Sequence, residues 1–94
     1  MKKILIIEDN TEVRENIEEI LALCGYQTFG AADGTSGVEL AISEEPDLIL
    51  CDVMMPKLDG FGVLNILSKK PETADIPFIF LTAKTDRSDR RMGM

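Results

Sequence analysis

The sequence predicts an α/β fold with a doubly wound parallel sheet, because short apolar runs alternate with amphipathic segments along the chain. Three runs show no polar alternation, as expected of parallel strands covered on both faces: 4–7, 48–51 and 78–81. A weaker strand is expected at 26–31. The resulting order, βαβαβαβ, implies right-handed crossovers that place helices on both faces of the sheet.

The predicted helices have recognisable ends. Asn10 or Thr11 is expected to cap the first helix, and Gly25 to end it. Asp33-Gly34 leads into the second helix, and the third follows Gly60. Helical spacing predicts that the first helix buries one stripe, which consists of Val13, Ile17, Ile20, Leu21 and Cys24.

Composition narrows the possible functions. The 94 residues fit one small domain, and 45% hydrophobic with 29% charged residues is typical of a globular chain. A net charge of −7 argues against nucleic-acid binding and favours basic or metal-bearing partners. The chain has no histidine, which excludes Ser/His/Asp and Cys/His catalytic sets.

The two cysteines and the absence of long apolar segments bear on location. Cys24 and Cys51 lack metal-ligand spacing, so we expect both to be reduced core residues of a cytoplasmic protein. We expect no signal peptide, since the apolar run after Met1-Lys2-Lys3 is short, and no apolar run is long enough to span a membrane.

Polar side chains follow three of the predicted strands at the point where each one ends. Glu8 and Asp9 come after the first strand, Asp52 after the third and Thr82 after the fourth. The carboxyl ends of parallel strands share one edge of the sheet, so these side chains should converge there. Clustered carboxylates repel one another without a cation, and Mg²⁺ suits such oxygen ligands. The sequence therefore predicts a magnesium site.

Short motifs around these positions occur in a fixed order: Glu8-Asp9, Asp52 followed by Met55-Pro56 and Asp59-Gly60, then Leu81-Thr82-Ala83. With them the chain strongly resembles the receiver domain of bacterial response regulators. The resemblance implies a flavodoxin-like sheet of order 2-1-3-4, with the family's fifth strand and fifth helix missing. Residues 1–94 would then be an incomplete receiver domain that lacks most of helix 4 as well.

The same resemblance implies roles for individual residues. Asp52 would be the phosphoacceptor, taking a phosphoryl group from a sensor histidine kinase or a phosphotransfer protein. Asp9 would bind Mg²⁺ directly and Glu8 through water, with Asp52 and the backbone carbonyl of Met54 as further ligands. Thr82 would donate a hydrogen bond to the phosphoryl group and act in the switch. The protein would thus be a signalling protein of a two-component system and not an enzyme.

Two further expectations follow from the resemblance. Residues two positions after the acceptor and two after the threonine tune self-dephosphorylation in the family; here they are Met54 and Lys84. Because Met54 cannot orient water, we expect slow hydrolysis. Without a fifth strand, the fourth strand becomes an unprotected edge, so self-association through residues 78–81 is expected.

Three alternatives compete with phosphoacceptor function. A flavodoxin-like nucleotide or flavin binder needs a phosphate-cradling loop after its first strand, where this chain has Glu8-Asp9-Asn10. A haloacid-dehalogenase-type phosphatase needs a second Asp two positions after its nucleophile, where this chain has Met54. The third alternative is a truncated receiver that is never phosphorylated and acts only as an association module.

Overall fold

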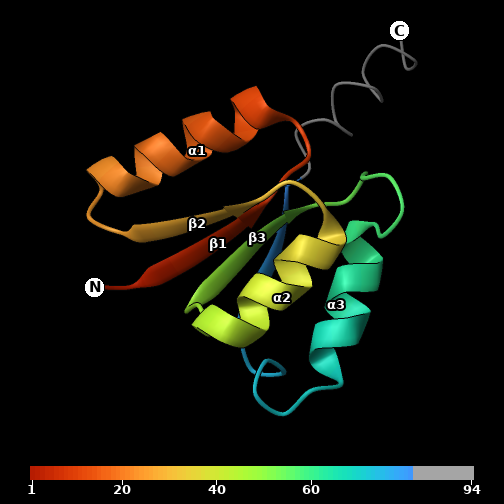
Figure 1. The fold of residues 1–94 in the computed structure, drawn as a ribbon. Helices are drawn as coiled ribbons and strands as arrows, with labels where there is room; N and C mark the ends of the chain where they lie inside the picture. The colour runs from red at the N-terminus through yellow and green to blue at the C-terminus, as the bar shows by residue number, and fades with distance from the viewer. Residues whose placement is uncertain (82–94) are drawn as a thin grey trace, which may run out of the picture.

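The computed structural model describes residues 1–81 and has an α/β architecture with one parallel sheet. The strand order is β2-β1-β3-β4, as predicted. Helix α1 lies on one face of the sheet, and α2 and α3 lie on the other (Figure 1). The elements are β1 (Lys3–Ile7), α1 (Thr11–Leu23), β2 (Gln27–Ala31), α2 (Gly34–Glu44), β3 (Leu48–Asp52), α3 (Gly60–Ser68) and β4 (Phe78–Leu81).

The register of the sheet brings the ends of its strands together. Ile7, the last residue of β1, is paired with Ala31 of β2 and with Cys51 of β3. Asp52, the last residue of β3, is paired with Leu81 of β4. The residues that follow β1 and β3 therefore leave the sheet side by side, at one edge.

The main hydrophobic core lies between the sheet and the pair α2–α3. Alternate residues of β1 and β3 point into it, as the pleat of a strand requires. Each fully buried Leu or Ile side chain stabilises the fold by about 1.5–3 kcal/mol. The core thus fixes both helices, and the loops that precede them, against the sheet. Its buried members are Leu5, Ile7, Ala31, Ala41, Ile49, Cys51, Met55, Val63 and Leu67.

Helix α1 is held less tightly than its sequence pattern predicts. It has no buried residue, and Ile20 is 60% exposed, so the expected buried stripe is wrong at this position. Val13, Ile17 and Leu21, spaced four apart, are the members of the stripe that are half-buried. The reason is that α1 packs mainly on β1 and β2, so the sheet covers only a narrow strip of the helix.

The helix ends largely follow the predicted signals. Asn10 caps α1 by accepting a hydrogen bond from the Val13 N–H (3.0 Å). Asp33 caps α2 in the same way. Gly25, after the end of α1, has the positive φ of 96° that glycine adopts without strain. None of the helices within residues 1–81 combines the length and apolar character needed to cross a bilayer.

The two cysteines have different environments, although both are free thiols. Cys24 is exposed at the C-terminal end of α1, so its predicted place in the core is wrong, and the narrow contact of α1 with the sheet is again the cause. Cys51 is fully buried, as predicted. Burial raises the pKa of the Cys51 thiol to about 12, helped by the negative charges of Asp52 and Glu8. Cys51 therefore stays protonated at neutral pH.

We predict that iodoacetamide at about pH 8 modifies Cys24 and leaves Cys51 untouched in the folded chain, because alkylation requires an accessible thiolate. Peptide mass spectrometry after the reaction identifies the modified residue. In denaturant both thiols should react, which controls for reagent and digestion. Alkylation of Cys51 under folding conditions would contradict the buried environment described for it.

Candidate metal centre

Three carboxylates meet where β1 and β3 end. One oxygen from each of Glu8, Asp9 and Asp52 lies within 4.8 Å of the other two. Glu8 and Asp52 are almost completely buried, with 1% and 0% of their surface exposed, while Asp9 is more accessible. The structure thus brings together the acidic residues that the sequence places at these strand ends.

The Glu8 side of the site is fixed by hydrogen bonds at both backbone and side chain. The Glu8 N–H donates to the Ala31 carbonyl of β2 (3.0 Å), and the Asn10 N–H donates to Glu8 Oε2 (2.9 Å). Arg14 Nη1 donates to the Glu8 carbonyl oxygen (2.8 Å). Sequence reasoning missed Arg14, although a basic residue one turn into the helix after an acidic pair was a usable signal.

On the Asp52 side of the site, the start of α3 packs closely against the backbone at the end of β3. A Cβ atom on Gly60 would lie 2.5 Å from the Asp52 carbonyl oxygen, so only glycine fits without a shift. The Gly60 N–H donates to the Val53 carbonyl (3.0 Å), which closes the loop between β3 and α3. The Met54 N–H lies 3.4 Å from Asp52 Oδ1. The backbone of Met54 is therefore next to the carboxylate of Asp52.

The two methionines after Asp52 have opposite environments. Met55 is 8% exposed and belongs to the hydrophobic core, as a packing residue should. Met54 is 63% exposed, so its side chain faces solvent. The loop backbone thus directs one of these neighbouring side chains into the core and leaves the other facing solvent.

The hydroxyl group that the sequence predicts at this site is that of Thr82. Thr82 lies outside the described residues, as do Ala83 and Lys84. Its neighbour Leu81 pairs with Asp52 in the sheet. The contribution of Thr82 therefore stays a prediction.

The donor set fits a hard divalent cation. All three side chains offer carboxylate oxygen, the ligand atom that Mg²⁺ and Ca²⁺ prefer. Two of the three carboxylates are removed from water, where like charges at this separation repel strongly unless positive charge offsets them. The site thus has the oxygen donors that a divalent cation requires.

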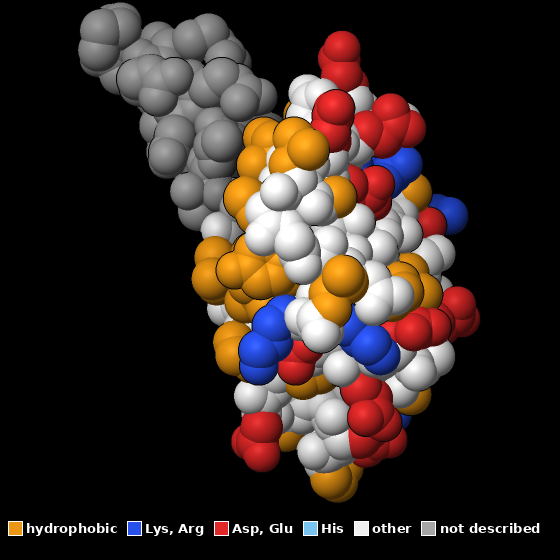
Figure 2. Space-filling model, turned by 90° about the vertical axis from the view of Figure 1, so that its left-hand side faces the viewer, with side chains coloured by type: hydrophobic (Ala, Val, Ile, Leu, Met, Phe, Trp, Pro, Cys, Tyr) orange, Lys and Arg blue, Asp and Glu red, His pale blue; other side chains and the backbone are white. Residues whose placement is uncertain are grey.

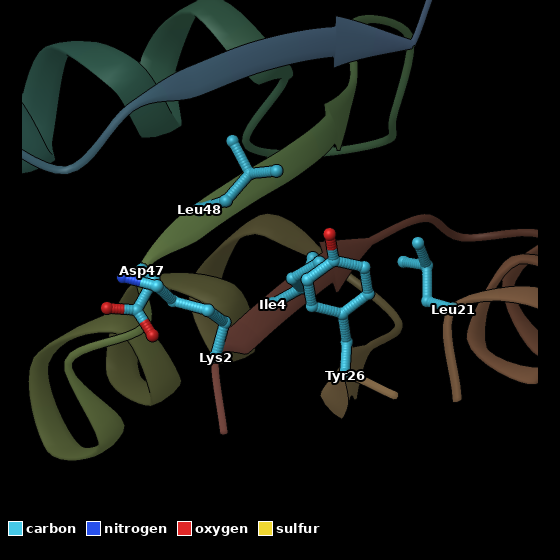
Figure 3. Close-up of a pocket in the computed structure, with 6 residues that line it drawn as sticks. All are labelled: Lys2, Ile4, Leu21, Tyr26, Asp47 and Leu48. Carbon is cyan, nitrogen blue, oxygen red and sulfur yellow. The ribbon is translucent and has the colours of Figure 1, made fainter. Parts of the chain in front are cut away.

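A hollow of about 310 Å³ lies at the opposite end of the strands (Figure 3). Figure 3 shows Lys2 and Leu21 on opposite sides of Tyr26. Asp47, the single acid there, accepts a hydrogen bond from the Lys3 N–H (2.7 Å). The hollow is mostly apolar and has no donor set for a metal. Its lining consists of Lys2, Ile4, Leu21, Tyr26, Asp47 and Leu48.

Several curated proteins similar to this chain are named as transcriptional regulators. It is 44% identical over 93 residues to the probable transcriptional regulator ycf27 of Cyanophora paradoxa, covering 99% of this chain and 38% of that protein. It is 41% identical over 93 residues to the DNA-binding dual master transcriptional regulator RpaA of Synechocystis sp., again over 99% of this chain, and covers 39% of that protein. The chain thus spans about two-fifths of the length of these relatives.

Solved structures with the same fold are receiver domains. One is the receiver domain of the sensor histidine kinase PA1611 from Pseudomonas aeruginosa PAO1, which has a magnesium ion coordinated in its active-site cleft. It matches with a TM-score of 0.84 and 33% identity, over 96% of this chain and 74% of that one. The N-terminal domain of a response regulator receiver protein from Methanoculleus marisnigri JR1 matches with a TM-score of 0.82 and 28% identity, over 94% and 76% of the two chains.

The match to a family is equally extensive. Residues 4–94 match the response regulator receiver domain, which is nearly the whole chain. The strand order and the carboxylates at the ends of β1 and β3 agree with the resemblance inferred from the sequence. The chain belongs to the response regulator receiver domain family of two-component systems.

Proposed function

We propose that Asp52 accepts a phosphoryl group from a phosphohistidine on a sensor histidine kinase or a phosphotransfer protein, and that the charged adduct switches a protein–protein interaction. The observation that supports this most is the position of Asp52, buried at the end of β3 within 4.8 Å of Glu8 and Asp9. A buried carboxylate beside two other acids is unusual in a protein core. It is useful where charge is managed during a reaction.

In the proposed transfer, a carboxylate oxygen of Asp52 attacks the phosphorus atom. A new O–P bond forms and the N–P bond of the phosphohistidine breaks. The imidazole nitrogen leaves with the electron pair and takes up a proton. The product is an acyl phosphate on Asp52, a covalent intermediate of a kind that carboxylates form readily. The backbone N–H of Met54, 3.4 Å from Asp52 Oδ1, helps to orient the nucleophile.

The proposed metal is Mg²⁺, with Asp9 and Asp52 as direct ligands, Glu8 acting through water and the Met54 carbonyl as a backbone ligand. Bound Mg²⁺ would neutralise charge on the transferred group. A water-mediated role suits Glu8, because its Oε2 already accepts the Asn10 N–H (2.9 Å). The position of the Met54 backbone beside Asp52 supports its inclusion.

The alternative of a purely associating module has a specific observation in its favour. Within residues 1–81, β4 pairs with β3 and has no strand on its other side. Ile79 on this strand is 52% exposed. In the view of Figure 2, hydrophobic side chains gather along the left-hand side, and acidic ones lie mainly toward the top, the right and the bottom. We propose that copies of this chain associate through β4, whether or not Asp52 is phosphorylated.

The net charge of the chain and its free thiols bear on its partners and its location. We propose that residues 1–94 make no direct contact with DNA, because a net charge of −7 opposes binding to a polyanion. Curated relatives are named as transcriptional regulators, but this chain spans only part of their length. A cytoplasmic location is consistent with two free thiols.

We predict that the chain gains one phosphoryl group from acetyl phosphate in the presence of Mg²⁺, and that Asp52→Asn abolishes this gain. The amide is neutral and cannot form an acyl phosphate. Intact-mass spectrometry measures the adduct, and Asp47→Asn, an exposed acid at the opposite end of the sheet, is the matched control. An adduct that persists in Asp52→Asn would rule out the assignment, whereas no adduct in the unmodified chain would favour the associating module.

A second prediction concerns the lifetime of the adduct. Met54→Asn should speed its hydrolysis roughly tenfold, because an amide beside Asp52 can orient the attacking water and a thioether cannot. Met54 is 63% exposed, so the change should leave folding intact. The decay of the phosphorylated mass over time gives the rate. Equal or slower decay in the variant would show that position 54 does not limit hydrolysis.

The proposed self-association makes a third prediction. The chain should elute as a dimer or larger species in gel filtration with light scattering, and Ile79→Lys should shift it toward monomer. A charge on an exposed edge strand opposes pairing between copies. Leu23→Lys, on the 82% exposed tip of α1, is the control with the same change in charge. A monomeric unmodified chain at micromolar concentration would refute association through β4.

A further inference from the structure

The loop between β3 and α3 is anchored to the body of the protein by two of its own side chains. Met55 is 8% exposed within the core, and Leu58 is half-buried and packs against that core. Both follow closely after Met54, whose backbone lies beside Asp52. The backbone of this loop is thus fixed on the side that faces away from solvent.

Leu58 sits in a slot that two glycines leave open. A Cβ atom on Gly34, the first residue of α2, would lie 2.6 Å from the Leu58 carbonyl oxygen and 2.9 Å from its Cβ. A Cβ atom on Gly62 of α3 would lie 2.5 Å from Leu58 Cδ1. All three distances are shorter than the 3.0 Å below which real Cβ contacts essentially never fall. A larger residue at Gly34 would displace the backbone of Leu58, and one at Gly62 would displace the end of its side chain.

The residue before Leu58 helps to direct it into the slot. Lys57 has a φ of 69°, the left-handed conformation that a residue other than glycine rarely adopts. This turns the chain sharply, so that Lys57 faces solvent while Leu58 faces inward. The pKa of Asp33 is lowered chiefly by its hydrogen bond from the Ser36 N–H, and partly by the charge of Lys57. Lys57 precedes Leu58, whose carbonyl oxygen lies beside Gly34 at the start of α2, so Lys57 is near the N-terminus of this helix.

We infer that Leu58 is a positioning residue that sets the ion selectivity of the acidic site. By seating the loop between Gly34 and Gly62, it holds the Met54–Met55 peptide at a fixed place and so favours Mg²⁺ over the larger Ca²⁺. The inference rests on the proposed function, in which the Met54 carbonyl is a metal ligand.

The physical reason lies in the different demands of the two ions. Mg²⁺ needs near-octahedral oxygen ligands at about 2.0–2.1 Å, whereas Ca²⁺ accepts irregular ligands at about 2.3–2.6 Å. A carbonyl oxygen on an anchored loop can hold the short, regular ligand distance that Mg²⁺ needs. A carbonyl oxygen on a loose loop can adjust at little cost to the longer and less regular ligand distances that Ca²⁺ accepts. Loss of the anchor should therefore harm Mg²⁺ binding more than Ca²⁺ binding.

The experiment measures the affinities of the 94-residue chain for Mg²⁺ and for Ca²⁺ by calorimetric titration, with each metal alone. Leu58→Ala should weaken Mg²⁺ binding by about tenfold, the lower end of the loss known for removing hydrogen-bonded partners of metal ligands. Ca²⁺ binding should change much less. Leu67→Ala is the matched control, because Leu67 is an equally large core residue on α3 that does not belong to the loop.

A second variant tests the same point without a cavity. Gly62→Ala adds a methyl group that must displace the end of Leu58, and in the first turns of α3 alanine also favours the helix. Circular dichroism checks that each variant is folded. The ratio of the Mg²⁺ affinity to the Ca²⁺ affinity should fall in Gly62→Ala as it does in Leu58→Ala. It should stay unchanged in Leu67→Ala.

The ratio of Mg²⁺ to Ca²⁺ affinity in each variant decides the inference. A fall in the ratio for both loop variants, with an unchanged ratio in Leu67→Ala, supports the inference. Mg²⁺ binding by the unmodified chain with an unchanged ratio in folded Leu58→Ala or Gly62→Ala overturns the inference and leaves the proposed function standing. An equal fall in Leu67→Ala would also overturn it, because selectivity would then follow general stability. An unmodified chain that binds no Mg²⁺ overturns both.

Discussion

The placement of three carboxylates at one edge of a parallel sheet is the constraint on which the rest of this structure depends. The register leaves no alternative, since Glu8 and Asp52 directly continue or end strands that pair residue by residue. Both side chains are buried, and like charges out of water oppose the folded state. The neighbouring core therefore has to hold the strand ends firmly. Leu5, Ile7 and Ile49, all nearly inaccessible to solvent, provide that hold on the same strands.

The segments that leave this edge are kept short and are closed by local polar contacts. Asn10 caps α1, and Asp33 and Asp59 cap α2 and α3 in the same manner. Each of these caps satisfies a backbone N–H that would otherwise lack a partner at a helix start. Asn10 and Asp33 follow their strands by three and two residues, and the longer loop to Asp59 turns back so that Gly60 contacts Asp52, which brings the helix starts close to the acids. The positive ends of their dipoles also face an edge that is rich in negative charge.

Much of this arrangement could be predicted from the sequence, and the exceptions share a cause. Uninterrupted apolar runs that end on an acid located β1 and β3, and with them the convergence of Glu8, Asp9 and Asp52. The exposure of Ile20 was missed, because it depends on how much of α1 the sheet covers. The slot for Leu58 was missed because it joins residues 34, 58 and 62, and a contact between distant residues leaves no local pattern. Local signals thus predicted the elements, their ends and the meeting of the strand ends, but not how far the sheet covers α1 or which side chains of distant loops and helices touch.

The structure also separates two tasks within a short stretch of chain. In the proposed site, Met54 contributes to metal binding through its backbone, and the backbone is held by the burial of Met55 and Leu58. The Met54 side chain, 63% exposed, takes no part in that support. Its identity can therefore change how water approaches a phosphoryl group on Asp52 without disturbing the ligand geometry. Conversely, substitution of Met55 or Leu58 can change the position of the Met54 carbonyl without changing the Met54 side chain that faces solvent. Because Met54 is exposed and Met55 is buried, the proposed site would allow the lifetime of an adduct and the binding of an ion to be adjusted independently.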